Sequence, residues 1–293
     1  MISTLRAMAG NPRALFELTK PRITFFILMS TAVGFVFGTR LGREWTWAEL
    51  VNALIGTMLI AGGTAALNQW YEREGDGLMR RTQARPIPSG RVSSRDALVF
   101  GTLLSAAGFF ELCIGNNLLA GFLALFTLAS YLFVYTPLKR RSPVSTTIGA
   151  IPGAMPPLIG YAAASGHLTY EAGILFAILF LWQFPHFYAI AWMYRDDYAR
   201  AGIRMLPVVE PNLDSTARRI VFFSLALVPM SLAPSYFQMA GSVYLFGAIV
   251  LGLMACYTGF QAMSSRSTLH ARRVLLTSVV YLPLLYGLLA LDS

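Results

Sequence analysis

Apolar residues dominate nine long stretches of the chain, and short polar stretches separate them. The apolar stretches are residues 22–39, 48–70, 97–115, 117–136, 144–163, 170–190, 220–238, 241–263 and 274–291. Each approximates the roughly 20 residues that an α-helix needs to cross the hydrocarbon of a bilayer. Turn-forming residues occupy the breaks, among them Thr136-Pro137 and Ser165-Gly166-His167. The pattern predicts an all-α integral membrane protein with nine transmembrane helices.

Composition supports a chain that is surrounded by a lipid bilayer. Of its 293 residues, 56% are hydrophobic and 13% are charged, whereas soluble domains average about 25% charged residues. The apolar stretches also exceed the roughly 10 residues of a barrel strand, which favours helices. We expect residues 1–21 to form a cytoplasmic N-terminal segment and residues 22–293 to form a single nine-helix domain.

Charge is distributed unevenly between the two sides that nine spans would define. All of the 23 Lys and Arg residues except Arg40 and Arg43 fall on one side. The positive-inside rule therefore predicts a multi-pass protein of the cell inner (plasma) membrane, with the N-terminus in the cytoplasm and the C-terminus outside. The net charge of +9 does not indicate a nucleic-acid partner, because the basic residues are spread among loops rather than gathered in one domain.

A polar row ends the second apolar stretch. Asn68, Glu72 and Asp76 are spaced i, i+4 and i+8, so a continuing helix places them on roughly one face. Acids at the end of a membrane span are costly unless they have a use. Charge bias alone would explain the neighbouring arginines but not this spacing. Amide and carboxylate oxygens of this kind can bind Mg²⁺ together with substrate phosphates.

Basic residues near the polar row suit phosphate groups. Arg81 and Arg85 stand four residues apart in a loop that Pro86 and Pro88 stiffen, and arginine binds phosphate through two donors at once. Lys139 and Arg140 follow another proline in a later loop. They either point back toward the same edge of the membrane or only contribute to the charge bias.

A second acidic segment follows the sixth apolar stretch. Asp197 and Arg200 either form a local i, i+3 pair that shapes the loop or contribute to a metal or substrate site. His186 lies late in the preceding stretch, beside Pro185 and among aromatic residues. A lone membrane histidine is often a hydrogen-bonded core residue, and haem ligation or proton transfer is the other interpretation.

These motifs resemble the UbiA superfamily of intramembrane prenyltransferases. The resemblance rests on Asn68-x-x-x-Glu72-x-x-x-Asp76, on the second acidic loop and on the nine spans. Within the superfamily, the chain is similar to the branch that farnesylates haem. The shared motifs are Asn-Gln-Trp-Tyr-Glu, Arg-Thr-x-x-Arg-Pro, Tyr-Thr-Pro-Leu-Lys-Arg, Pro-His-Phe and Asp-Tyr-x-x-Ala-Gly-Ile. The similarity runs from about residue 18 to the C-terminus.

The resemblance implies a fold, a reaction and a set of site residues. It implies a UbiA-type fold and transfer of a farnesyl group from farnesyl diphosphate to a vinyl group of haem B. Water adds in the same process, and the products are haem O and diphosphate. A downstream haem-modifying enzyme is the implied partner that would receive haem O. It implies Mg²⁺ on Asn68, Glu72, Asp76 and Asp197, substrate on Arg81, Arg85, Tyr135, Lys139, Arg140 and Arg200, and haem at His186. The residue four after Asp196 is Arg200 rather than the aspartate common in the superfamily.

Three alternatives stay open at this point. A sister prenyltransferase acting on an aromatic or quinone precursor would share the metal–diphosphate half of the site. A membrane transporter would place polar residues near the midplane, whereas charge here gathers at one face. A non-catalytic haem-binding scaffold would have no need of the polar row.

Overall fold

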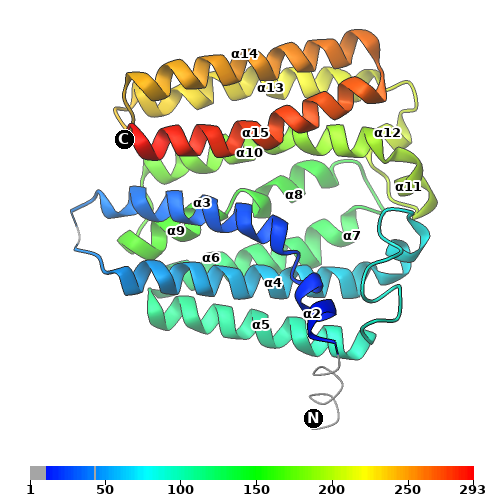
Figure 1. Cartoon of the computed structure of the whole chain (residues 1–293), viewed down its shortest axis with the longest axis horizontal. Helices are drawn as coiled ribbons and strands as arrows, with labels where there is room; N and C mark the ends of the chain where they lie inside the picture. Colours follow the sequence, from blue (N-terminus) through cyan, green and yellow to red (C-terminus); the bar gives the residue numbers. More distant parts are fainter. Residues whose placement is uncertain (1–10, 43) are drawn as a thin grey trace.

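The computed structural model describes residues 11–42 and 44–293, and within these ranges the chain is helical without strands. Residues 1–10, which begin the predicted N-terminal segment, and Arg43 lie outside the described residues. Eight apolar helices are long enough to span a membrane and run side by side along the bundle (Figure 1). They are α3 (Pro21–Thr39), α4 (Trp47–Leu78), α5 (Ser94–Gly115), the continuous run Leu118–Leu138, α10 (Tyr170–Met193), α13 (Asp214–Tyr236), α14 (Ser242–Ser265) and α15 (Thr268–Leu291). The predicted all-α membrane fold is confirmed.

The fifth apolar stretch, predicted as one span over 144–163, is a broken pair of helices. α8 (Ser145–Gly153) and α9 (Pro156–Ser165) are separated by Ala154 and Met155. Pro156 and Pro157 lack the amide hydrogens that would continue the hydrogen bonding of α8, so the helix ends and a new one starts at the prolines. The two short helices follow one another across the bundle in Figure 1, so the segment still crosses it, as predicted.

The turn predicted at Thr136-Pro137 is wrong. Three elements follow one another without a break: α6 (Leu118–Ala129), the π-helix η1 (Ser130–Tyr135) and α7 (Thr136–Leu138). The Thr136 amide donates to the Tyr131 carbonyl in the wide turn of η1. Pro137 then lies in the first turn of α7, where a missing amide hydrogen costs little. The chain therefore leaves the bundle only after Leu138.

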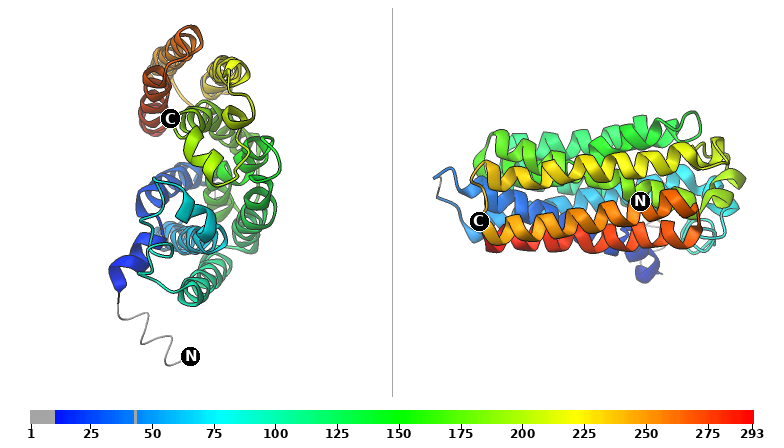
Figure 2. Two further views of the ribbon diagram at one scale, coloured as in Figure 1. Left: turned by 90° about the vertical axis from the view of Figure 1, so that its right-hand side faces the viewer. Right: turned by 90° about the horizontal axis from the view of Figure 1, so that it is seen from above.

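Close backbone contact fixes α3 against α9. A side chain on Gly34 would collide with the Pro157 carbonyl, and one on Gly160 would collide with the Thr31 carbonyl. Small residues allow membrane helices to approach this closely. The left view of Figure 2 looks along the bundle and shows α3–α5 and α13–α15 as two groups on opposite sides of the cross-section, with α8–α10 between them.

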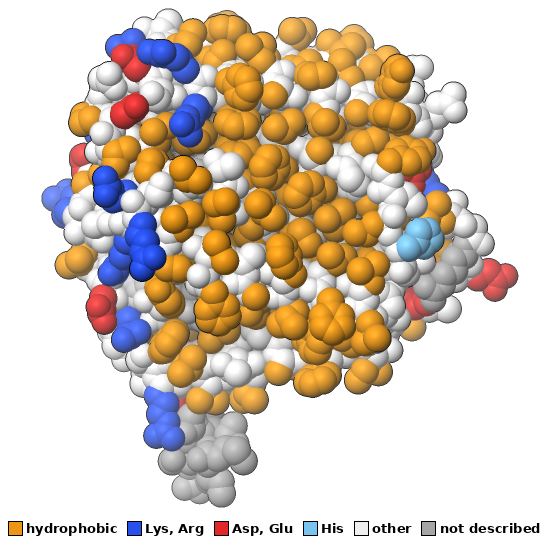
Figure 3. All heavy atoms as spheres, turned by 180° about the vertical axis from the view of Figure 1, so that it is seen from behind, with side chains coloured by type: hydrophobic (Ala, Val, Ile, Leu, Met, Phe, Trp, Pro, Cys, Tyr) orange, Lys and Arg blue, Asp and Glu red, His pale blue; other side chains and the backbone are white. Residues whose placement is uncertain are grey.

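Charged side chains gather at one end of the bundle, which we call the charged end. It contains the loop of residues 79–93, the short helices α11 (Arg195–Arg200) and α12 (Leu206–Val209), and the start of the loop after α7 (Figure 1). Figure 3 shows Lys and Arg there and a broad hydrophobic band beside it. On the long apolar helices, large side chains such as Phe133 and Phe246 are exposed, which suits contact with lipid. The side of the membrane that the charged end faces stays a prediction.

Candidate functional site

The polar row (Asn68, Glu72 and Asp76) is helical, as its spacing predicted. α4 continues past the apolar stretch that ends at residue 70 and stops only at Leu78. Asn68 is 1% exposed and Asp76 is fully buried. The helix continues because this face is covered by other segments of the charged end rather than by water.

Glu72 lies at the centre of the row and binds both a neighbour and a distant cation. The Asn68 amide donates to Glu72 Oε2 at 3.0 Å, and the Lys139 ammonium donates to Glu72 Oε1 at 2.9 Å. Burial lowers the pKa of Lys139, but the Glu72 carboxylate together with Tyr135 and Tyr131 raises that pKa well above its ordinary value. Lys139 is therefore a permanent cation beside the row, which was one of the two alternatives that the sequence left open.

Asp76 is neutralised by the loop that follows its own helix. Arg85 Nη1 donates to both carboxylate oxygens of Asp76, at 2.8 and 2.7 Å. The Thr82 hydroxyl donates to the Asp76 carbonyl at 2.9 Å, which closes the end of α4. The proline-stiffened loop thus folds back so that Arg85 reaches the row.

Lys20 belongs to the site and was missed by the sequence reasoning, which used it only for orientation. It immediately precedes α3, and its ammonium donates to Asn68 Oδ1 at 3.2 Å. Burial, with the positive charge of Arg85 second, lowers the pKa of Lys20 to about 7. No carboxylate among the described residues pairs with it within ion-pair distance. The sequence signal for Lys20 was its position directly before a proline at the start of a span. That position did not indicate that Lys20 lies close to Asn68.

Asp197 fastens the second acidic segment to the first. It accepts a hydrogen bond from the Arg81 backbone amide at 3.2 Å and forms an ion pair with Arg200. Arg200 Nε also donates to the Leu78 carbonyl at the end of α4, at 3.4 Å. Asp196, by contrast, is exposed, and among the described residues its ion pair is with its neighbour Arg195. The structure therefore brings Asp197 to the rim of the site by way of the loop that carries Arg81.

Two predicted phosphate ligands contact residues other than the three of the polar row. The Arg81 guanidinium lies 5.0 Å from the Tyr194 ring centre and donates to the Tyr198 hydroxyl at 3.4 Å. Arg140 lies beside Gly75 and lines a surface groove that also contains Trp70. Within the described residues, neither arginine forms an ion pair with an acid of the row, and their roles stay predictions.

Aromatic rings lie beside the Lys139 ammonium, which also pairs with Glu72. The Lys139 ammonium lies 4.5 Å from the ring centre of Tyr135, and that ring lies 5.0 Å from the Tyr131 ring. Both tyrosines come from the π-helix η1, whose wide turn brings residues four apart onto the same face. Single turns of π-helix recur at functional sites in proteins. Tyr135 is thus beside the site, while its predicted contact with substrate stays a prediction.

His186 belongs to a different part of the molecule from the polar row. Its ring stacks on Trp182 at 4.9 Å, and its Nδ1 lies 2.9 Å from the hydroxyl of Ser278 on α15. Among the described residues, neither its hydrogen bonds nor its ring contacts involve the acids of the charged end. Its predicted role toward haem stays a prediction.

The donors of the row fit a metal that a substrate helps to bind. Within the described residues, no three His, Cys, Asp or Glu side chains converge into a complete metal cage. The row offers two carboxylates and an amide oxygen, and Mg²⁺ commonly takes such a small oxygen set together with substrate phosphates and water. Lys20, Arg85 and Lys139 surround the same oxygens, so the arrangement suits a metal-bound diphosphate.

Comparison with known families places the chain. The model of the UbiA prenyltransferase family matches residues 27–282. The chain belongs to the UbiA prenyltransferase family. It is therefore a prenyltransferase that spans the membrane several times, and the resemblance read from the polar row is confirmed.

Individual relatives agree with the family. The chain is 59% identical over 287 residues to the protoheme IX farnesyltransferase of Solibacter usitatus, and the match covers 96% of this chain and 98% of the relative. Among solved structures, a digeranylgeranylglyceryl phosphate synthase superposes with a TM-score of 0.79 at 15% identity, covering 96% of this chain and 98% of that one. A UbiA homologue from Archaeoglobus fulgidus bound to GPP and Mg²⁺ superposes with a TM-score of 0.63 at 16% identity, covering 94% of this chain and 99% of that one. At such low identity the two structures support the fold alone.

Proposed function

We propose that this family member transfers a farnesyl group from farnesyl diphosphate to a vinyl group of haem B, with addition of water, to give haem O and diphosphate. The polar row with its three surrounding cations supports the diphosphate half of this reaction. The haem half is supported by the protoheme IX farnesyltransferase of Solibacter usitatus, which is 59% identical over nearly the whole length of both chains.

The charges of the site favour a metal–diphosphate complex. Glu72 and Asp76 contribute two negative charges, while Lys139 and Arg85 pair with them and Lys20 adds a cation without a carboxylate. With Lys20 protonated, the site has an excess positive charge. Because burial lowers the pKa of Lys20 to about 7, a bound anionic diphosphate would favour that protonated form. We assign Mg²⁺ to Asn68, Glu72 and Asp76, and the phosphate oxygens to Lys20, Arg85 and Lys139. Bound Mg²⁺ would supply Lewis-acid stabilisation of the leaving diphosphate.

Breaking the bond between the farnesyl carbon and the diphosphate oxygen creates an allylic cation and a more negative leaving group. Fixed cations that face the leaving oxygens stabilise that charge more in the transition state than in the bound substrate. Tyr131 and Tyr135 present π-faces beside Lys139, where the ring quadrupole favours a cation. We assign these rings to shielding the allylic cation from water on the side that faces the membrane.

On the haem side of the proposed reaction, one carbon–carbon bond forms and one water molecule is added. The farnesyl carbon bonds to the terminal carbon of the vinyl group, and the cation that forms next to the porphyrin ring is captured by water. That water then loses a proton, which leaves a hydroxyl group on the product. Close placement of vinyl group and allylic carbon is needed, because the cation reacts with whatever is nearest.

The decisive test is product formation by the purified chain in lipid nanodiscs. Haem B and farnesyl diphosphate are incubated with and without Mg²⁺, and the products are weighed by mass spectrometry. We expect haem O with Mg²⁺ and no haem O when the ion is chelated. Prenylation of an aromatic or quinone precursor instead of haem would favour a sister activity, and chelation without effect would remove the metal from the proposal. The same proposal places the charged end in the cytoplasm of an inner-membrane protein.

A further inference from the structure

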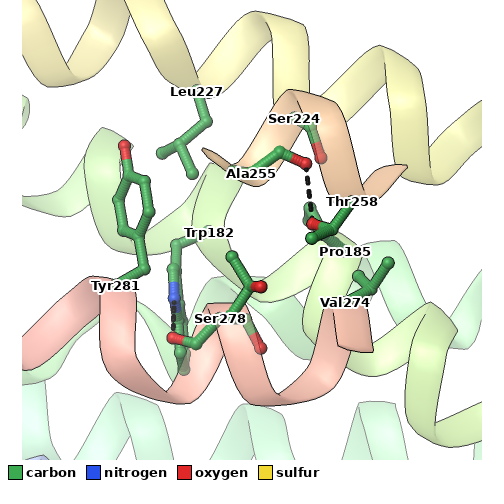
Figure 4. A pocket seen from close by; sticks show the side chains of 10 residues that line it. Trp182, Pro185, Ser224, Leu227, Ala255, Thr258, Val274, Ser278 and Tyr281 are labelled. Carbon is green, nitrogen blue, oxygen red and sulfur yellow. Dashed lines mark hydrogen bonds between the residues drawn. The ribbon is translucent and has the colours of Figure 1, made fainter. Parts of the chain in front are cut away.

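Two side chains of α10 converge on one residue of α15. The Trp182 indole donates to the Ser278 carbonyl at 2.8 Å, and Figure 4 shows this bond linking the two helices. One turn further along α10, His186 Nδ1 lies 2.9 Å from the Ser278 hydroxyl. The indole and imidazole rings stack with 4.9 Å between their centres. The plane and the direction of the imidazole are therefore fixed from two sides.

The hydrogen bonds around Ser278 determine which nitrogen of His186 carries the proton. A serine hydroxyl has one proton, and here it is donated to the Leu275 carbonyl at 2.7 Å. Toward His186 the hydroxyl oxygen is consequently an acceptor, so His186 Nδ1 must be the donor. In a neutral imidazole the other nitrogen then carries the lone pair. Nε2 of His186 is thus left as a free base or metal ligand.

We propose that Ser278 is a positioning residue that fixes His186 as a neutral Nε2 ligand for the iron of the haem substrate. Metal-binding histidines commonly donate their second ring nitrogen to a carboxylate, carbonyl or water, which fixes the tautomer and the orientation of the ring. Ser278 provides an equivalent acceptor. The inference rests on haem being the acceptor in the proposed function.

His186 lies in the last third of α10, the helix that leads to the charged end. His186 lies seven residues before the end of α10 at Met193, which is on the order of 10 Å along a helix. Asp197 and the charged end follow directly after α10. Pro185 interrupts the hydrogen bonding of α10 beside His186, which loosens the helix at that point. His186 itself is only partly buried.

The test measures the absorption spectrum of haem B bound to the full chain in nanodiscs. We expect wild type to show a nitrogen-ligated haem, and His186→Gly to lose that spectrum and regain it when imidazole is added. Ser278→Ala should weaken haem affinity by about 10- to 100-fold, the range found when acceptors behind a metal ligand are removed. Ser278→Thr, which keeps the hydroxyl, should restore both affinity and spectrum. An unchanged spectrum in His186→Gly would overturn the proposal.

Ser224→Ala is the matched control. Ser224 lines the same small cavity as Ser278 between α10, α13, α14 and α15 (Figure 4), and within the described residues its buried hydroxyl has no hydrogen-bond partner. The Ser224→Ala variant should bind haem with the wild-type spectrum and affinity. Equal losses in Ser224→Ala and Ser278→Ala would overturn the positioning role.

Product formation separates this inference from the proposed function. A nitrogen-ligated haem that depends on His186 but is not farnesylated would refute the function and leave the ligand assignment intact. Haem O formed by a chain whose His186→Gly variant keeps the wild-type spectrum would refute the ligand assignment alone. If His186→Gly kept the spectrum but yielded a farnesylated product without the added hydroxyl, His186 would act as a base toward water, and the iron assignment would also fall.

Discussion

The carboxylates of the two acidic segments at the charged end are held by different kinds of partner. In the polar row, Glu72 pairs with Lys139, 67 residues away, and Asp76 is buried against Arg85 from the following loop. In the second segment, Asp197 pairs with Arg200 three residues on and accepts a backbone amide. Asp196 is exposed. An acid held by distant cations in a buried site is costly to maintain and indicates ligand chemistry, whereas a local pair with a backbone contact indicates support for a loop.

Among the variants of the two acidic segments, Asp76→Asn should give the largest loss of haem O formation. The substitution keeps shape and removes the charge that we assign to Mg²⁺, so haem O formation should fall about 100- to 1,000-fold. Initial rates measured by mass spectrometry at saturating haem check this result. Arg85 also loses its carboxylate partner, so thermal melting in nanodiscs is needed to show that the variant is folded. Turnover within threefold of wild type would remove Asp76 from the mechanism.

Lys20→Gln tests the cation that the sequence reasoning missed. Because Lys20 has no carboxylate partner among the described residues, its removal should leave the folded chain intact. It should raise the KM for farnesyl diphosphate about tenfold through loss of one charge-assisted hydrogen bond. Titration of farnesyl diphosphate at fixed haem measures the change. An unaltered KM together with a lower melting temperature would make Lys20 a structural residue.

Asp197→Asn should have a smaller effect, and of a different kind. The charge that pairs with Arg200 is lost while an amide oxygen still faces the Arg81 amide, so we expect a severalfold lower rate. Hydrogen exchange should speed up at residues 79–85, because the loop is no longer held by a carboxylate. If Asp197→Asn instead matched Asp76→Asn in rate and in dependence on Mg²⁺, the second segment would hold metal too, and the contrast would fail.

Asp196→Asn should give the smallest effect and serves as the control for both acidic variants. The Asp196 side chain is 84% exposed, and its ion pair with Arg195 is a surface contact. Such pairs contribute little to stability. Activity and melting temperature should therefore match wild type. A loss comparable to that of Asp197→Asn would show that exposure does not separate the acids of this segment.

Local patterns predicted much of the fold and part of the site. The lengths of the apolar stretches predicted nine spans, and eight of these are continuous helices, because the thickness of a bilayer sets the length of a membrane helix. The i, i+4, i+8 spacing correctly placed Asn68, Glu72 and Asp76 on one helical face. The errors arose where the local signal was ambiguous. Pro137 was interpreted as part of a turn, whereas the π-helix η1 continues directly into α7, which contains this proline. Hydropathy also could not show the break between α8 and α9.

The sequence by itself determined that the chain spans the membrane, where most of its helices run and which acids share a face, since these follow from hydrophobic length and helical period. Only the tertiary structure decided which cation neutralises each acid, that Lys20 joins the site and that Ser278 orients His186. These pairs join residues far apart in the chain, such as Lys20 with Asn68 and His186 with Ser278. No periodicity records such distances, because they are set by how helices pack against one another.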